Sequence, residues 1–301
     1  MRRAGPRRPS RRMSGAALLL VMWLIALLTA LIGGFALAAR IEHMQGVVLS
    51  RGFVAAQAAR AGAEYAITRV AISDPRLRWL SDGRPYPWTF ANARIEVRIV
   101  DESGKVDLNN ADATLLTGLF RALGQPRAQA GQMASAILDW RDADSLTQPA
   151  GGAEDADYAS AGRPYGAKDA PFEDVAEVQQ VLGMTPALYA QAAGLLTVYT
   201  GRAQPDPAFA AAPVLTAMGL EAEQVIALRE RYDPASGQPQ PTLPGGQPLV
   251  AGSSGTYSIE SRARLADGRK SVLRIVVRTG GNGVPGSAYT PLRWEEGASL
   301  R

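Results

Sequence analysis

The strongest constraint on this 301-residue chain is an uncharged apolar segment near its amino end. Residues 16–39 contain no charged side chain and consist mainly of Leu, Ala, Ile, Val and Met. As a helix this segment is about 36 Å long, enough to cross a hydrocarbon core of roughly 30 Å. Six arginines lie within the first 15 positions, and such flanks stay in the cytoplasm. The sequence therefore predicts a single transmembrane helix over residues 16–39, with the amino terminus cytoplasmic and the body periplasmic.

Three fates of this segment remain open. An ordinary signal peptide would be cut after Ala36-Leu37-Ala38, although its apolar core would be unusually long. The helix could also remain as a plain uncleaved anchor. Thirdly, Gly15 stands between the basic leader and the apolar run, which resembles the class III leader of type IV pilins and pseudopilins. That resemblance implies cleavage of residues 1–15 between Gly15 and Ala16, N-methylation of Ala16, and retention of the helix.

The pattern beyond the membrane favours a retained helix. Residues 36–72 are rich in strong helix formers and contain no proline, so the helix is predicted over residues 16–73. A continuous helix from Ala16 to Ile72 would be about 85 Å long. The alternative is an anchor followed by a separate helix, because Gly33-Gly34 and Gly46 disfavour helix. Most pilin-like subunits have glutamate at the fifth mature position, which here is Leu20; a subunit with no neighbour above it gains by this replacement.

Three strands are predicted from the sequence. Residues 94–100 alternate between apolar and charged side chains, which is typical of a half-buried antiparallel strand. Residues 256–265 and 271–278 flank an Asp267-Gly268 turn and predict a hairpin. Because a lone hairpin is marginally stable, the first strand is expected to join it, giving a sheet domain over residues 90–103 and 256–295. Residues 74–88 are expected to form an irregular connection.

The segment between these strands is helical in pattern. Its apolar groups are separated by short breaks at Gly124, Gly183 and Gly219, which predicts antiparallel helical hairpins over residues 104–233. A weak internal repeat relates residues 109–116 to residues 211–215. Residues 234–255 are rich in Pro, Gly, Gln and Ser and predict a flexible linker. The fold class is thus α+β: a pilin-like long N-terminal helix and a small antiparallel sheet, with a large all-α domain inserted between strands.

Charge and composition exclude several kinds of function. The formal net charge is +4, but the six leading arginines account for more than this, so the body has a slight negative charge and no broad surface for nucleic acid. The chain has no cysteine and one histidine, which leaves carboxylates, hydroxyls and lysines for any catalysis. The helical hairpins resemble helix-hairpin-helix modules, yet Pro126 removes a backbone N–H that a phosphate site would use. We expect no nucleic acid partner; a membrane-anchored DNA-binding protein stays as an alternative.

Six carboxylates fall between Asp139 and Asp157, and only Arg141 opposes them. A bound cation would relieve this repulsion, and oxygen-only ligands on a loop suit calcium. The spacing is not that of an EF-hand. A solvated acidic loop is one alternative, and a hydrolase with Asp142 and Glu154 as acid and base is another.

Several motifs then occur in a specific order: the class III-like leader, Asp101-Glu102-Ser103-Gly104-Lys105, Leu138-Asp139-Trp140-Arg141-Asp142, Gly152-Ala153-Glu154 and Pro164-Tyr165. This order resembles the K-type minor pseudopilins of bacterial type II secretion over nearly the whole chain. The resemblance implies a non-enzymatic subunit that caps the periplasmic pseudopilus and nucleates its assembly, and a helical domain of the helix-hairpin-helix or SAM-like kind.

The same resemblance implies the partners and the metal site. The expected partners are the I-type and J-type minor pseudopilins, the prepilin peptidase, the inner-membrane secretion platform and the lipid bilayer. The implied cofactor is calcium, and its side-chain ligands would be Asp142, Asp144, Glu154 and Asp157.

Overall fold

The computed structural model describes residues 14–74, 76–233, 236, 238–239, 241–243, 246, 248–249, 253–280 and 288–297, without the side chains of residues 14–16. The chain divides into two compact units, residues 1–54 and 55–301. Most of the predicted leader therefore lies outside the described residues.

One helix, α1, runs without interruption from Ser14 to Ala71, over 58 residues. Gly33, Gly34 and Gly46 do not break it, so the structure supports the continuous helix over an anchor joined to a separate helix. Its residues 17–54 are exposed almost without exception, including the large apolar side chains of the predicted membrane segment. By length and composition it is the one helix of the described chain that could cross a membrane.

From Ala55 onward α1 packs against a sheet. The buried positions recur every three or four residues and thus form one helix face: Ala55, Ala58, Ala59, Ala63, Ala66, Ile67 and Val70. Gly62 lies so close to the sheet that a Cβ there would come within 2.4 Å of Ser261 Oγ and 2.7 Å of an Ile95 methyl group. Small side chains along this face are what allow the close approach.

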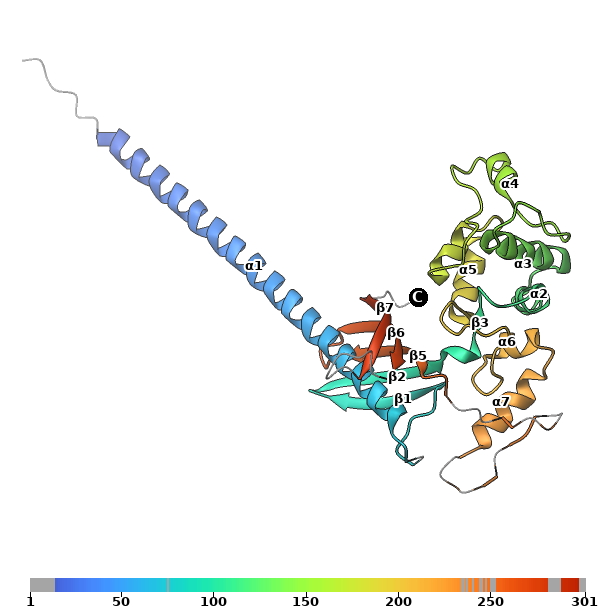
Figure 1. The fold of residues 1–301 in the computed structure, drawn as a ribbon. Coiled ribbons are helices and arrows are strands. Elements are labelled where there is room, and N and C mark those ends of the chain that lie inside the picture. The colour runs from blue at the N-terminus through green and yellow to red at the C-terminus, as the bar shows by residue number, and fades with distance from the viewer. Residues whose placement is uncertain are drawn as a thin grey trace, which may run out of the picture. The chain divides into compact units, whose positions relative to one another are not determined.

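The sheet is antiparallel and has the strand order β1-β2-β5-β6-β7 (Figure 1). Its strands are β1 (Asp82–Phe90), β2 (Ala93–Asp101), β5 (Thr256–Arg264), β6 (Lys270–Thr279) and β7 (Tyr289–Glu296). The predicted hairpin is confirmed as β5 and β6, with Gly268 at φ +86° in the turn. The strand predicted over residues 94–100 is confirmed as β2, which pairs with β5.

The prediction of an irregular connection holds for residues 74 and 76–81 but is wrong for residues 82–88, because β1 lies there. Pro85 and Pro87 obscured the strand, since proline cannot donate a ladder hydrogen bond. In the structure β1 is an edge strand paired only with β2, and the two prolines are two residues apart. Both missing N–H groups therefore point away from β2, where no bond is lost.

The helical domain is inserted between β2 and β5 (Figure 1). It contains α2 (Ala113–Ala122), α3 (Arg127–Arg141), α4 (Asp155–Ser160), a 3-10 helix (Val175–Gln180), α5 (Pro186–Ala192), α6 (Ala212–Ala217) and α7 (Ala222–Arg231). A short parallel pair, β3 (Val106–Asp107) and β4 (Leu196–Thr197), joins its two halves. The expected α+β class with a helical insertion is thus observed.

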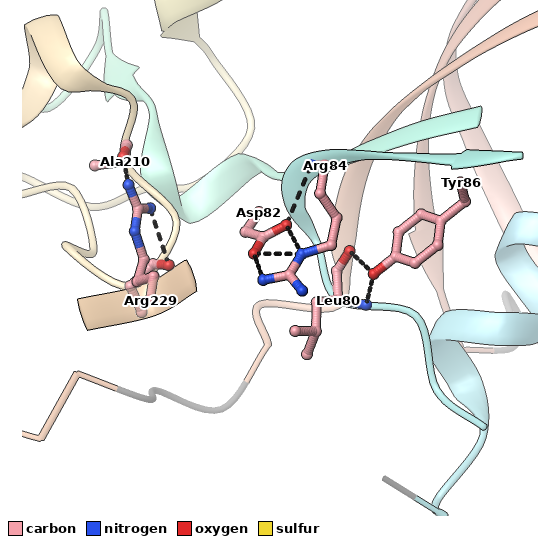
Figure 2. Close-up of polar contacts among 7 residues, drawn as sticks. Leu80, Asp82, Arg84, Tyr86, Ala210 and Arg229 are labelled. Carbon is pink, nitrogen blue, oxygen red and sulfur yellow. Dashed lines mark hydrogen bonds and ion pairs between the residues drawn. The ribbon is translucent and has the colours of Figure 1, made fainter. Parts of the chain in front are cut away.

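The weak internal repeat in the sequence corresponds to a repeat in the structure. Asp107 and Asp206 each accept a hydrogen bond from the backbone N–H two residues on, at 2.9 Å, and so form the same turn before α2 and α6. Near the end of each helical hairpin, an arginine hydrogen-bonds to backbone carbonyls that precede the first helix of that hairpin. Arg141 donates to the carbonyls of Leu108 and Ala111. Arg229 donates to the carbonyl of Ala208 and to that of Ala210, the second contact being shown in Figure 2.

These equivalent contacts show that the second module uses the same turn although its sequence, Pro205-Asp206-Pro207, departs from the first. The two modules pack directly, because Gly118 of α2 lies against the backbone of Ala217 in α6. Figure 2 also shows the start of β1, where Arg84 pairs with Asp82 at 2.6 Å and Leu80 N–H donates to the Tyr86 hydroxyl at 2.6 Å.

Buried polar contacts attach the insertion to the sheet. Lys105 Nζ donates to Glu102 Oε1 at 2.5 Å and to Ser258 Oγ of β5 at 2.6 Å. Gly104 has no space for a side chain, since a Cβ would lie 2.4 Å from the carbonyl carbon of Phe209. The helical domain is therefore held to the end of the sheet at which β2 finishes.

The linker predicted over residues 234–255 differs from expectation at two positions. Leu243 and Leu249 are buried in the core of the helical domain, with 6% and 2% of their surface exposed. Thr242 also bridges to Pro248. Composition predicted a flexible linker, whereas the burial of Leu243 and Leu249 depends on packing against the helical core.

Candidate metal centre

The acidic motif converges where α3 ends and α4 begins. Asp139, Asp142 and Glu154 each place one carboxylate oxygen within 4.8 Å of the others. Asp139 and Asp142 are three residues apart at the carboxyl end of α3, so they lie on the same side of the helix. Glu154 is the N-cap of α4 and returns to this point through the loop of residues 143–153.

Asp139 organises that loop. It is completely buried, and its two carboxylate oxygens accept hydrogen bonds from Ala153 N–H at 2.7 Å and Gln148 N–H at 3.2 Å. The loop backbone passes so close that a Cβ on Gly152 would lie 1.8 Å from Asp139 Oδ2. Glycine is therefore required at position 152 for the loop to close around this carboxylate.

The crowded carboxylates shift one another's pKa values upward. Burial, followed by the negative charges of Asp139, Asp142, Asp169 and Asp144, together raises the pKa of Glu154 to about 7. Burial followed by the charge of Asp144 raises the pKa of Asp142. Burial also raises the pKa of Asp139, against the two loop N–H groups that lower it. Without a counterion, the cluster opposes its own ionisation.

Two oxygen atoms of the cluster have no hydrogen-bond partner among the residues that the structure describes. Glu154 has 7% of its surface exposed, and its Oε1 is buried and unpartnered. Asp142 Oδ1 is buried and unpartnered as well. Buried acceptors without a donor are unfavourable in a folded protein. Oxygen ligands of this kind fit a hard divalent cation, and the irregular, all-oxygen arrangement fits calcium.

The structure brings together two of the four predicted ligands, Asp142 and Glu154. Asp144 is exposed and accepts a hydrogen bond from Leu146 N–H at 2.9 Å. Asp157 accepts one from Glu154 N–H at 3.0 Å and thus caps α4. Both lie outside the close group.

Sequence reasoning missed two contributors. Asp139 was counted in the acidic stretch but was not expected among the ligands; its three-residue spacing from Asp142 at a helix end is the signal that could have found it. Asp169 lies 15 residues beyond Glu154 and has a positive φ of +53°, and its charge reaches both Asp142 and Glu154. Asp169 was left out of the predicted ligands because members of the resembled family often have Asn at this position.

The alternative of a carboxylate hydrolase requires a substrate groove at these side chains. The adjacent groove, about 400 Å³, is lined by Gln125, Gln129, Gln132 and the backbone side of residues 151–153, among others. None of the three clustered carboxylates lines it. Trp140 and Tyr158, in the helices on either side of the loop, pack with their ring centroids 5.8 Å apart.

The predicted processing residues lie at the start of α1, where the backbone of Gly15 and Ala16 is helical. Their side chains, and residues 1–13 before them, are outside the described part of the chain. The structure leaves cleavage and methylation as predictions.

Comparisons with known proteins point in one direction. Residues 93–201 match the family described as "Type II secretion system (T2SS), protein K". A "Type II secretion system protein K" from Klebsiella pneumoniae is 28% identical over 250 residues, which cover 72% of this chain and 76% of that protein. Another of the same description, from Pectobacterium carotovorum subsp. carotovorum, is 28% identical over 123 residues, covering 39% of this chain and 37% of that protein's own length.

A solved structure shares the fold. It is described as the crystal structure of the GspK-GspI-GspJ complex from the type 2 secretion system of enterotoxigenic Escherichia coli. The alignment has a TM-score of 0.60 and 19% sequence identity and covers 84% of this chain and 99% of that chain. The pilin-like helix, sheet and inserted helical domain are thus an arrangement that a secretion subunit already uses.

Proposed function

Because this chain belongs to the protein K family of type II secretion systems, we propose that it is a minor pseudopilin that caps the periplasmic pseudopilus and nucleates its assembly. The observation that carries the proposal is α1. One uninterrupted helix contains an exposed apolar segment and a second segment packed on the sheet. A helix of this kind can anchor the subunit in the inner membrane and later join the helical core of a fibre.

The inserted domain supports a position at the tip. It is attached to the sheet by buried contacts at the end where β2 finishes. A domain of this size at one end of the sheet would obstruct a further subunit at that end. Leu20 is consistent with the same position, because a tip subunit has no neighbour above to pair with a buried glutamate.

The partners follow from this role. The structural neighbour was solved with GspI and GspJ, so we propose I-type and J-type minor pseudopilins as partners of this chain. A prepilin peptidase would cleave between Gly15 and Ala16, and Ala16 would then be methylated. The subunit would have a cytoplasmic amino terminus and a periplasmic body, would contact the secretion platform in the bilayer, and would act by assembly without substrate turnover.

We further propose calcium as the cofactor of the helical domain. Asp139, Asp142 and Glu154 would hold the ion, with Asp144 and Asp169 adding negative charge nearby. The unpartnered oxygens of Asp142 and Glu154 support this proposal. When bound, the ion supplies the positive charge that fixes the loop of residues 143–153, and thereby the shape of the cap.

Calcium affinity is expected to fall as the pH is lowered through 7. Glu154 has a pKa of about 7 in the metal-free protein, and its protonated form offers no anionic ligand. The apparent Kd should rise about tenfold from pH 8 to pH 6, as one proton competes with the ion. Isothermal titration calorimetry of the full chain in detergent measures this. Glu154→Gln should remove the dependence, and equal affinities of the native chain at pH 6 and pH 8 would contradict it.

The same pKa shift has a consequence for the metal-free fold. The folded pKa of Glu154 is raised above its ordinary value of 4.5, so the folded state binds the proton more tightly than the unfolded state. Metal-free stability is therefore expected to decrease as the pH rises from 4.5 to about 7. Calcium should offset this loss most strongly at the upper end of that range.

The mature amino terminus tests the proposed function directly. Mass spectrometry of the chain isolated with I-type and J-type subunits should show a methylated Ala16 as the first residue, and the chain should be present at the fibre tip. A mature chain that retains residues 1–15, or that begins at Ala39, would reject the pseudopilin assignment.

A further inference from the structure

The charges of this protein are distributed unevenly between its sheet and its helical domain. The five strands of the large sheet contain nine basic and six acidic residues. Residues 104–233 contain nine basic and seventeen acidic residues. The large sheet is therefore net basic, although the body as a whole has a net negative charge.

Three of the basic residues form a row across neighbouring strands. Arg94 of β2 pairs directly with Arg264 of β5, and Arg264 pairs directly with Lys270 of β6. All three are exposed, while their neighbours Ala93, Ile95 and Ala263 are buried in the core against α1. Because side chains alternate along a strand, the row points away from α1.

This row is not neutralised by any described residue. Ion pairs of the same sheet lie elsewhere and include Arg98 with Glu96 at 3.1 Å and Arg274 with Glu260 at 2.7 Å. Neither Arg94, Arg264 nor Lys270 has a side-chain hydrogen bond or ion pair within the described part of the chain. Like charges directly opposite one another destabilise a sheet. The row therefore lowers the stability of the isolated subunit, and the negative charges of an acidic partner would relieve this repulsion.

The row also lies at a defined end of the sheet. The helical domain follows the last residue of β2, Asp101, whereas Arg94 is near the first. Seven residues of strand separate them, which is about 23 Å. The packed part of α1 passes close to the row, since a Cβ on Gly62 would come within 2.7 Å of a methyl group of Ile95, the residue after Arg94.

We propose that Arg94, Arg264 and Lys270 form a docking surface for an acidic patch on the adjacent minor pseudopilin of the fibre. This inference rests on the proposed function. The cap obstructs one end of the sheet, so the adjacent subunit lies toward the other end, where the row is. Opposite charge then steers the two subunits together and sets their register, and this attraction weakens with salt.

The test uses the full chain with all three side chains reversed, R94E/R264E/K270E, co-purified in detergent with the I-type and J-type minor pseudopilins of the same system. The native chain should bind them, with a Kd that rises at least tenfold between 50 and 300 mM NaCl. The reversed chain should bind at least tenfold more weakly at 50 mM NaCl and lose most of the salt dependence. The matched control is R121E/R127E/R202E, which reverses three exposed cations of the helical domain and should bind as the native chain does.

Each other outcome has a distinct meaning. If the native chain itself does not bind the two subunits, the proposed function fails. If the native and reversed chains bind them equally, with the same salt dependence, the proposed function stands and the docking surface is overturned. It is also overturned if the reversal leaves subunit binding unchanged but abolishes binding to vesicles containing phosphatidylglycerol, because the occupant is then a bilayer. An unfolding temperature equal to that of the native chain verifies that the reversed chain is folded.

Discussion

Chelation of calcium is expected to lower the unfolding temperature of this protein by about 10 °C. An ion present at about 1,000 times its Kd stabilises a folded protein by about 4 kcal/mol. For a chain of this size each kcal/mol shifts the unfolding temperature by about 2–4 °C. The physical cause is the close approach of Asp139, Asp142 and Glu154, which repel one another once the ion is removed. Differential scanning fluorimetry in 1 mM calcium and in EGTA measures the effect.

Variants separate the metal from other causes of stability. The double variant D142N/E154Q should lose the response to calcium altogether. Its unfolding temperature should equal or exceed that of the native chain in EGTA, because the repulsion has also been removed. The matched control is E221Q/E223Q, which neutralises two exposed carboxylates of the second helical module and should retain the full response. A native chain that unfolds at the same temperature in calcium and in EGTA would refute the metal site.

The second large effect is expected at the leader. Gly15→Leu should block cleavage before Ala16, so that the chain keeps its six arginines and stays in the inner membrane. A retained basic leader cannot be drawn into the bilayer with the helix, because each charge there is costly. Incorporation into the pseudopilus should therefore be lost, and secretion by this system should be abolished, as expected when a step of assembly is blocked.

The control for this variant lies in the same helix. Gly33→Leu introduces the same side chain into α1, where a Cβ would meet no described atom within 4 Å apart from the helix's own backbone, and it should be processed normally. Immunoblotting of membrane and fibre fractions distinguishes the precursor from the mature chain. Normal secretion by the Gly15→Leu chain with its leader still attached would contradict the requirement for processing.

Local patterns predicted those elements whose signal lies within a few residues. The alternation in residues 94–100 and the Asp267-Gly268 turn led to β2 and to the β5–β6 hairpin, because strand period and turn chemistry are local properties. β1 was missed because Pro85 and Pro87 argue against a strand, and only its place at the sheet edge makes them tolerable. Leu243 and Leu249 were assigned to a linker because their burial depends on the distant helical core.

The acidic site was likewise predicted only in part from the sequence. The density of carboxylates between Asp139 and Asp157 is visible in the sequence and was enough to suggest a cation. Which of them meet was decided by the end of α3 and the return of the loop, which bring Asp139, Asp142 and Glu154 together and leave Asp144 and Asp157 outside the group.

The sequence by itself determined the membrane helix, the class of fold and the presence of an acidic loop, because apolar length, periodicity and charge density are written along the chain. Only the tertiary structure decided which oxygens lie unpartnered in the acidic cluster and which cations of the sheet form one row. Those properties depend on strand register and on close approach between segments that are far apart in the chain, and no local pattern encodes them.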